Sequence, residues 1–236
     1  LKNIFKMKFK TPIGRIGSDI WANIRLKAVI REVGQIRNKK ILDIGCETAP
    51  YIGESFIKNN DVTFTDLLQE SLERVKHKNC KKVKLDLTKP NKLKEQSFDM
   101  IVCADVMEHI ENEKLALTNL LKLLKKNGIL IFTAPAYQKF YGIHDKKIGH
   151  FRRYDKSDIK RIAEEHNLKT IRTRHLVSLI LPLFIIAQRT KKSESLYENK
   201  SELEKKIIPL LNLFCEIDER LNLPFGICIM AIFRKN

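Results

Sequence analysis

The chain has 236 residues, which is long enough to bury a sizeable core in one domain. Apolar residues make up 43% of the chain and charged residues 31%, a balance that excludes an intrinsically disordered protein. The formal net charge of +17 favours partners such as RNA, anionic lipid or acidic substrates. Most of the excess comes from lysines scattered along the whole chain, however, and this distribution indicates a generally basic surface.

The cysteines and the lengths of the apolar runs favour a cytoplasmic protein. None of the five cysteines belongs to a C-x-x-C pair, so reduced thiols are expected and a zinc site is not. The N-terminal residues lack the apolar core of a signal peptide. The longest apolar stretch, 176–187, is interrupted by Ser178 and Pro182 and falls short of the roughly 20 residues that cross a bilayer.

Strands and helices alternate over the first 135 residues. Apolar residues at helical spacing predict a helix over 19–33. Strands are predicted over 40–44, 62–65, 82–87, 98–103 and 129–133, with helices over 51–58, 68–76 and 113–126. Asn127-Gly128 is expected to cap the last of these helices, and Pro135 to end the fifth strand. Such alternation predicts an α/β fold in which helices cover both faces of a parallel sheet.

The last hundred residues follow a different pattern. A helix is predicted over 157–166 and a strand over 169–174, followed by the apolar stretch and a polar linker over 190–200. Apolar residues recur every three or four positions over 202–221, which predicts a long amphipathic helix. This helical insertion would precede a final strand over 227–233.

Acidic residues stand at the ends of three successive predicted strands, at Asp43, Asp66 and Asp86. The carboxyl ends of parallel strands meet at one edge of a sheet, where ligands bind. Gly45 would let the backbone approach a ligand closely. Asp66, which follows Asp43 by 23 residues, occupies a position from which acidic side chains bind ribose hydroxyls. Each carboxylate alone could be a turn former or a helix cap, but the three together predict a nucleoside ligand.

Three sequence motifs follow one another between residues 21 and 135. They are ILDIGCETA at 41–49, FDMIVC at 98–103 followed by DVMEH at 105–109, and NGIL at 127–130. In these motifs the chain resembles the class I S-adenosylmethionine (SAM)-dependent methyltransferases. The resemblance implies a Rossmann-like, seven-stranded, mostly parallel sheet and SAM as the cofactor. It implies cofactor contacts from Arg25, Asp43, Gly45, Cys46, Asp66, Leu67, Asp86, Leu87 and Ala104.

The first motif departs from the family pattern at two positions. Glu47 and Ala49 replace its second and third glycines. A glutamate at the first of these places an anion near the expected methionine end of the cofactor. Either this side chain points away, or SAM binding is weakened, which leaves open a binding module without catalysis.

The DVMEH motif resembles the ubiquinone-type O-methyltransferases. Asn23-Ile24-Arg25 resembles their N-x-R element, in which arginine holds the SAM carboxylate, and a planar guanidinium suits that task. A solvated helix face is the alternative for Arg25. Some relatives carry a divalent metal near the motif, and Asp105, Glu108 and His109 could do so or could orient the following helix. We expect no metal.

The segment 136–154 is expected on the substrate side. Its pattern H-D-x-x-x-G-H-x-R-R-Y resembles uncharacterised methyltransferases that accompany glycosyltransferases and lipid-linked glycan pathways. Histidine accepts protons near neutral pH, so the candidate bases are His109, His144 and His150. Bracing of the loop, with Asp145 as a partner, is the alternative for the last two. The candidate substrate contacts are Tyr137, Tyr141, Arg152, Arg153 and Tyr154.

These features predict one methyltransferase domain over 1–236. It would comprise a helical region over 1–38, a SAM-binding core over 39–135 and a substrate-side part over 136–236. The expected reaction is methyl transfer to a small-molecule, glycan or lipid-linked acceptor, at oxygen. Nucleic acid is not an expected partner, although the charge leaves an RNA methyltransferase as the alternative. Peripheral membrane contact through 176–192 and a homodimer are left open, beside ordinary core packing.

Overall fold

A computed structural model describes residues 16–46, 51–77, 80–179, 181–182, 185, 217–218 and 221–236. The side chains of 16–24 and 51 lie outside this description, and so do Glu47 and Ala49. The predicted linker over 190–200 also lies outside it, as does most of the predicted helix over 202–221.

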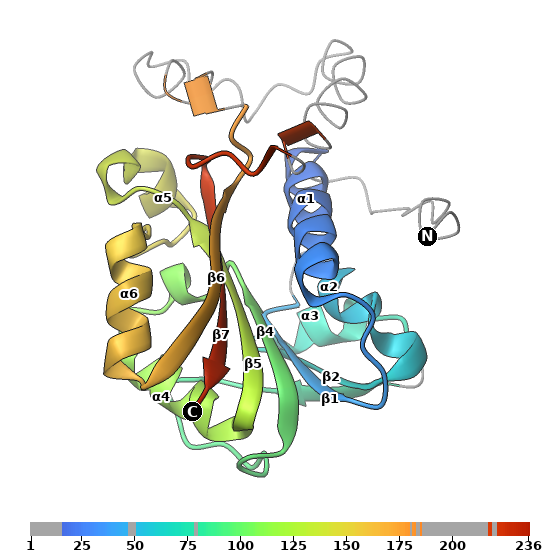
Figure 1. Ribbon diagram of the computed structural model, residues 1–236. Helices are drawn as coiled ribbons and strands as arrows, with labels where there is room; N and C mark the ends of the chain where they lie inside the picture. The colour runs from blue at the N-terminus through green and yellow to red at the C-terminus, as the bar shows by residue number, and fades with distance from the viewer. Residues whose placement is uncertain are drawn as a thin grey trace.

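Seven strands form one sheet in the order β3-β2-β1-β4-β5-β7-β6 (Figure 1). Their bounds are β1 (Lys40–Ile44), β2 (Asp61–Asp66), β3 (Lys81–Lys84), β4 (Phe98–Ala104), β5 (Leu124–Pro135), β6 (Leu168–Leu176) and β7 (Cys228–Lys235). The first five strands run parallel, and β7 is antiparallel to both of its neighbours. The predicted mostly parallel, seven-stranded sheet is therefore confirmed.

Helices cover both faces of this sheet, as the alternation predicts. They are α1 (Ile16–Val33), α2 (Tyr51–Glu54), α3 (Gln69–Arg74), α4 (Glu113–Leu123), α5 (Ile143–Lys147) and α6 (Lys156–Glu165), with short 3-10 turns at η2 (Ile57–Asn59), η3 (Met107–His109) and η4 (Gln138–Phe140). In Figure 1, α1, α2 and α3 lie on one side of the strands, and α4 and α6 lie on the other. The carboxyl ends of β1 to β5 meet at one edge of the sheet, which is where ligands bind in such folds.

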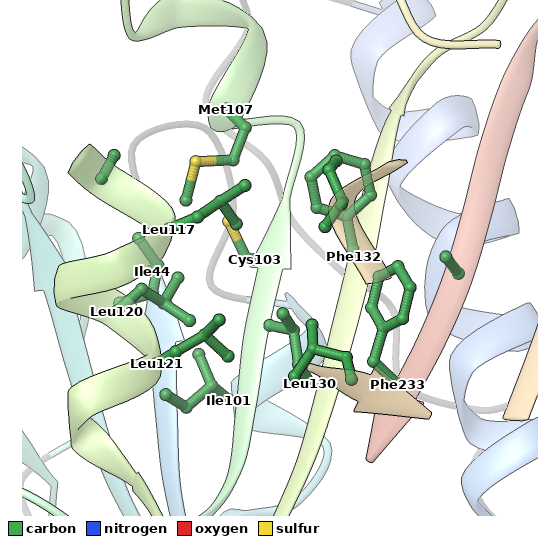
Figure 2. Close-up of a cluster of buried hydrophobic side chains, with 14 of the residues drawn as sticks. Ile44, Ile101, Cys103, Met107, Leu117, Leu120, Leu121, Leu130, Phe132 and Phe233 are labelled. Atoms are coloured by element: carbon green, nitrogen blue, oxygen red, sulfur yellow. The ribbon is translucent and has the colours of Figure 1, made fainter. Parts of the chain in front are cut away.

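Alternate residues of the central strands contribute to two separate hydrophobic cores. The first core lies on the α4 side of the sheet and the second on the α1 side. Ile101 and Cys103 of β4 pack on the α4 side, whereas Met100 and Val102 pack on the α1 side. Figure 2 shows Leu120 of α4 directed toward the strand residues of the first core. Because both faces of β4 are buried, its residues from Met100 to Ala104 are all apolar, and the strand is predictable for that reason.

The boundary between α4 and β5 differs from the prediction. The helix ends at Leu123 rather than at residue 126, and Leu124 is already extended, with φ −79° and ψ 132°. Asn127, at φ +61°, lies inside β5, where the pairing with β4 shifts register, and it does not cap the helix. Leaving the helix early buries Leu124 completely in the core, and this burial outweighs the local capping signal.

The end of β3 also differs from the prediction, and the apolar stretch is described in part. β3 ends at Lys84, so Asp86 lies in a turn beyond the strand rather than at its last position. The segment 176–192 is described only at 176–179, 181–182 and 185. Its first residues, Leu176 and Val177, are buried in the core on the α1 side, which favours core packing for this part of the stretch. No helix within the described ranges is long and apolar enough to cross a membrane.

Candidate active site

The loop after β1 approaches the loop after β4 closely at Gly45. This glycine has φ +76°, a left-handed conformation, and its N–H donates to the carbonyl oxygen of Thr65 at 2.8 Å. A Cβ atom at Gly45 would lie 2.5 Å from Cγ2 of Val106. The position therefore requires glycine for its backbone conformation and for its lack of a side chain.

Asp43 is buried beneath this turn, with 5% of its surface exposed. Its Oδ2 accepts a hydrogen bond from the backbone N–H of Gly53 at 3.0 Å, which ties β1 to α2. Burial raises the pKa of Asp43 to about 7, and the bond from Gly53 only partly opposes that effect. The bond from Gly53 shows that Asp43 orders the turn after β1.

Asp66 is the last residue of β2 and Asp86 follows β3, and each carboxylate accepts hydrogen bonds from its own loop. Oδ1 of Asp66 accepts from the N–H of Leu68 at 2.8 Å, and Asp66 is 7% exposed. Oδ1 of Asp86 accepts from the N–H and the hydroxyl of Thr88, at 2.9 Å and 2.6 Å, and these bonds hold the pKa of Asp86 below its usual value. The hydrogen bonds from Thr88 therefore favour the ionised form of Asp86.

The other expected cofactor contacts differ widely in exposure. Cys46 is buried, and burial followed by the charges of Asp66 and Asp43 raises the pKa of its thiol to about 12. Leu67 is exposed, whereas the side chain of Leu87 lies in the core on the α4 side. Ala104 is the last residue of β4 and is half-buried.

Arg25 of α1 forms an ion pair with Asp105, which follows β4. The Arg25 side chain is 18% exposed, so the alternative of a solvated helix face is wrong. Asp105 has φ +53° and also accepts a hydrogen bond from the hydroxyl of Thr133 at 2.8 Å. The pair thus joins α1 to the ends of β4 and β5 at the expected cofactor edge.

Glu108, His109 and His150 form a compact cluster. One potential ligand atom from each residue lies within 4.8 Å of the other two, and the two imidazole rings meet edge to face with centroids 4.5 Å apart. Glu108 is 1% exposed, and burial, followed by the charge of Asp105, raises its pKa well above the usual value. The cluster therefore places two imidazole rings beside a buried carboxyl group whose neutral form is favoured.

His150 is connected to a buried carboxylate within the loop 136–154. Asp145 is fully buried, and its Oδ1 contacts Nδ1 of His150 and Nε of Arg153, each at 2.9 Å. Burial opposes ionisation of Asp145, but these two hydrogen bonds outweigh it and hold its pKa below the usual value. His144 lies on α5, and burial lowers its pKa.

The expected substrate residues divide into two groups. Arg152 donates to the carbonyl oxygens of Ile110 and Glu111, both at 2.6 Å, and Arg153 is 6% exposed against Asp145. Tyr154 is 1% exposed and packs edge-on against a core phenylalanine. These internal contacts assign the three side chains to the framework of the loop rather than to a surface that contacts substrate.

The two remaining tyrosines have different contacts. Tyr137, at φ +65°, stacks on the ring of His175, with centroids 5.2 Å apart and 13° between the ring planes. The hydroxyl of Tyr141 donates to the carbonyl oxygen of His150 at 2.8 Å. Both tyrosines are half-buried, and both belong to the loop 136–154, which also carries His150.

The burial of Glu108 and Asp145 is not among the features that the sequence predicts. The apolar neighbours Met107 and Ile110 are the sequence signal for burial of Glu108. The spacing of five residues between Asp145 and His150 is the signal for their direct contact. Neither partner geometry follows from the sequence alone.

Substitution of Gly45 should cost more stability than substitution of Gly34. Both glycines have positive φ, but a Cβ at Gly34 would meet nothing within 4 Å. Gly34→Ala is expected to lower the free energy of unfolding by about 1 kcal/mol, the cost of the left-handed backbone alone. Gly45→Ala adds the clash with Val106, so a loss of about 2–4 kcal/mol is expected in urea denaturation. Equal losses in the two variants would contradict this geometry.

The burial of Asp43 predicts a pH dependence of stability. Its pKa in the folded chain, about 7, lies above the ordinary 3.8, so the folded state binds the proton more tightly. Stability from this group is therefore complete below about pH 4 and is lost as the pH rises through about 7. Asp43→Asn stays neutral and keeps an oxygen for Gly53, so near pH 8 it should be more stable than wild type by up to about 4 kcal/mol. The exposed Asp61→Asn serves as control, and chemical denaturation between about pH 4 and 8 measures both. A constant difference across this range would argue against a buried, titrating Asp43.

Comparisons with known proteins agree with this geometry. Residues 21–173 match a family model described as a methyltransferase domain. The ubiquinone biosynthesis O-methyltransferase of Rickettsia typhi is 29% identical over 123 residues, 47% of this chain and 48% of that protein. The corresponding protein of Rickettsia canadensis is 32% identical over 126 residues, 47% of this chain and 50% of that protein. The chain thus spans about half the length of the curated relatives it matches.

A solved structure supports the fold over most of the chain. The N-methyltransferase NodS from Bradyrhizobium japonicum WM9, in complex with S-adenosyl-L-homocysteine, has a TM-score of 0.57 and 16% identity, covering 92% of this chain and 87% of that chain. At this identity the likeness concerns the fold alone. The family model, in contrast, matches more than half of the chain, and the chain therefore belongs to the methyltransferase-domain family within the class I SAM-dependent methyltransferases.

Proposed function

We propose that this chain transfers a methyl group from SAM to a hydroxyl of a small-molecule, glycan or lipid-linked acceptor. The observation that carries the proposal is the arrangement at the carboxyl edge of the sheet. There Gly45, which has no side chain, lies between the strand-end carboxylates and the ion pair formed by Arg25 and Asp105. The histidine cluster stands beyond β4, beside the same edge.

The described residues fit the parts of SAM. Asp66 would bind the ribose hydroxyls, and Asp86 would meet the adenine amino group. Arg25 would hold the carboxylate of the methionine end, sharing its guanidinium with Asp105. Gly45 would allow the backbone to approach the cofactor, as its missing Cβ and close contact with Val106 suggest. Bound there, the sulfonium would supply an activated methyl group.

Oxygen is the proposed acceptor atom. A hydroxyl must lose its proton as it attacks, and His109, His144 and His150 are the candidate bases. The curated relatives are named ubiquinone biosynthesis O-methyltransferases, and this name agrees with an oxygen acceptor. The match to them covers only about half of their length. The half-buried rings of Tyr137 and Tyr141 would flank a planar or apolar acceptor.

A cytoplasmic location belongs to the same proposal. Four described cysteines, Cys46, Cys80, Cys103 and Cys228, are free thiols. Reduced thiols are typical of proteins in a reducing compartment. A homodimer and peripheral membrane contact through 176–192 stay predictions.

SAM binding tests the cofactor part of the proposal. Isothermal titration of the full chain should show one site, and Asp66→Asn should weaken SAM about 10–100-fold by removing a charged hydrogen-bond partner of the ribose. Asp61→Asn is the matched control, because Asp61 is exposed at the opposite end of the same strand. It should bind SAM as wild type does. If wild type produces no heat at millimolar SAM, the proposal fails.

Methyl transfer to oxygen is tested with SAM that carries a deuterated methyl group. The probes are catechols and phenols with and without an alkyl tail, and mass spectrometry measures the product. We expect the label on a hydroxyl oxygen, since a base beside the cofactor edge activates that group. Label found only on amines, with the matching anilines in the same panel, would contradict an oxygen acceptor.

A further inference from the structure

The loop 136–154 holds the ring of His150 from one side. The side chain of His150 is 10% exposed, and its Nδ1 lies 2.9 Å from Oδ1 of the fully buried Asp145. The His150 backbone N–H donates to the carbonyl oxygen of Asp145 at 2.8 Å, and Tyr141 donates to the His150 carbonyl oxygen at 2.8 Å. Main chain and side chain are therefore both fixed.

We infer that Asp145 and His150 are the proton-accepting pair of the acceptor site, with Asp145 positioning His150 so that Nε2 receives the hydroxyl proton. The inference rests on the proposed methyl transfer to oxygen and selects one base from its three candidates. Asp145 is the positioning residue of the pair, and His150 is the catalytic residue.

The hydrogen-bonding chemistry of Asp145 determines the tautomer of His150. An ionised carboxylate can only accept, so the nitrogen that faces it must carry the proton. In a neutral imidazole this leaves Nε2 with a free lone pair, and Nε2 is the atom that can accept a second proton. The same arrangement orients the histidine base in hydrolases with a Ser-His-Asp triad.

Arg153 keeps Asp145 in the required ionised form. Its Nε donates to the same Oδ1 at 2.9 Å, and the side chain is 6% exposed. The backbone N–H of Gly142 donates to Oδ2 at 2.9 Å. A buried carboxylate without such partners would be protonated, and it could then donate to His150 and reverse the tautomer.

The second ring of the cluster lies beside His150. His109 meets it edge to face, with centroids 4.5 Å apart, and the backbone N–H of Phe151 donates to the carbonyl oxygen of Glu108 at 2.7 Å. These contacts join the loop 136–154 to η3, directly after the β4 end that bears Asp105. His150, the proposed base, is thereby held next to the edge of the sheet where the cofactor is expected.

The step balances without any further reactant. The acceptor oxygen forms a bond to the methyl carbon of SAM as its proton passes to Nε2 of His150. The carbon–sulfur bond breaks, and its electron pair stays on sulfur, giving S-adenosylhomocysteine. Asp145 stabilises the imidazolium, which then releases the proton to solvent.

The tautomer of His150 is the direct test. Long-range proton–nitrogen NMR spectra of the full-length, nitrogen-15-labelled chain distinguish protonated from unprotonated ring nitrogens, and His150→Gln assigns the signal. We expect the neutral wild-type ring to carry its proton on Nδ1. Asp145→Asn, whose amide can donate, should move the proton to Nε2, whereas Asp158→Asn, a carboxylate substitution on α6, should leave the signal unchanged.

A wild-type His150 with its proton on Nε2 would overturn the inference, as would an unchanged tautomer in folded Asp145→Asn. If Asp145→Asn does not fold, the wild-type spectrum alone tests the inference. For any acceptor that turns over, Asp145→Asn should lower kcat about 10²-fold or more with SAM affinity unchanged. Titrating SAM into the same sample distinguishes failure of this inference from failure of the proposed methyltransferase function. If SAM binds but His150 carries its proton on Nε2, only the role assigned to Asp145 and His150 is contradicted.

Discussion

The parallel pairing of β1 with β2 and β4 determines where this protein can carry chemistry. Parallel strands end at the same edge, so the turns that follow Ile44, Asp66 and Ala104 are brought together although they are far apart in sequence. The return of β7 as an antiparallel strand completes the sheet without covering that edge. Every contact proposed for cofactor or acceptor depends on this alignment.

The central strands were predictable because burial on both faces leaves a simple sequence pattern. β1 has the predicted bounds, and β4 extends the predicted strand by one residue. The start of β5 was not predictable, because Asn127-Gly128 is also a common helix cap. Whether this dipeptide ends a helix or lies within an irregular strand depends on the pairing with β4, which is a tertiary contact.

In the site, too, the positions of residues along the backbone were predictable, whereas the contacts of their side chains were not. Strand-end positions place Asp43 and Asp66 at the carboxyl edge of the sheet, since their location depends only on topology. Arg25 lies on α1, and its expected role came from the resemblance of Asn23-Ile24-Arg25 to a family element. The partners of Arg152 and Arg153 could not be read from the sequence. Arg152 binds carbonyl groups some forty residues away in the chain, and Arg153 binds a carboxylate whose burial depends on the folded loop.

The contacts of Arg152 have a consequence for substitutions in this part of the chain. Its guanidinium binds carbonyl oxygens at Met107, Ile110 and Glu111, and these bonds join the loop 136–154 to the turn after β4. Carbonyl groups are present whatever side chains these positions carry. The side chains of Ile143 and Phe151, which are exposed on the same loop, can therefore be substituted without loss of these contacts.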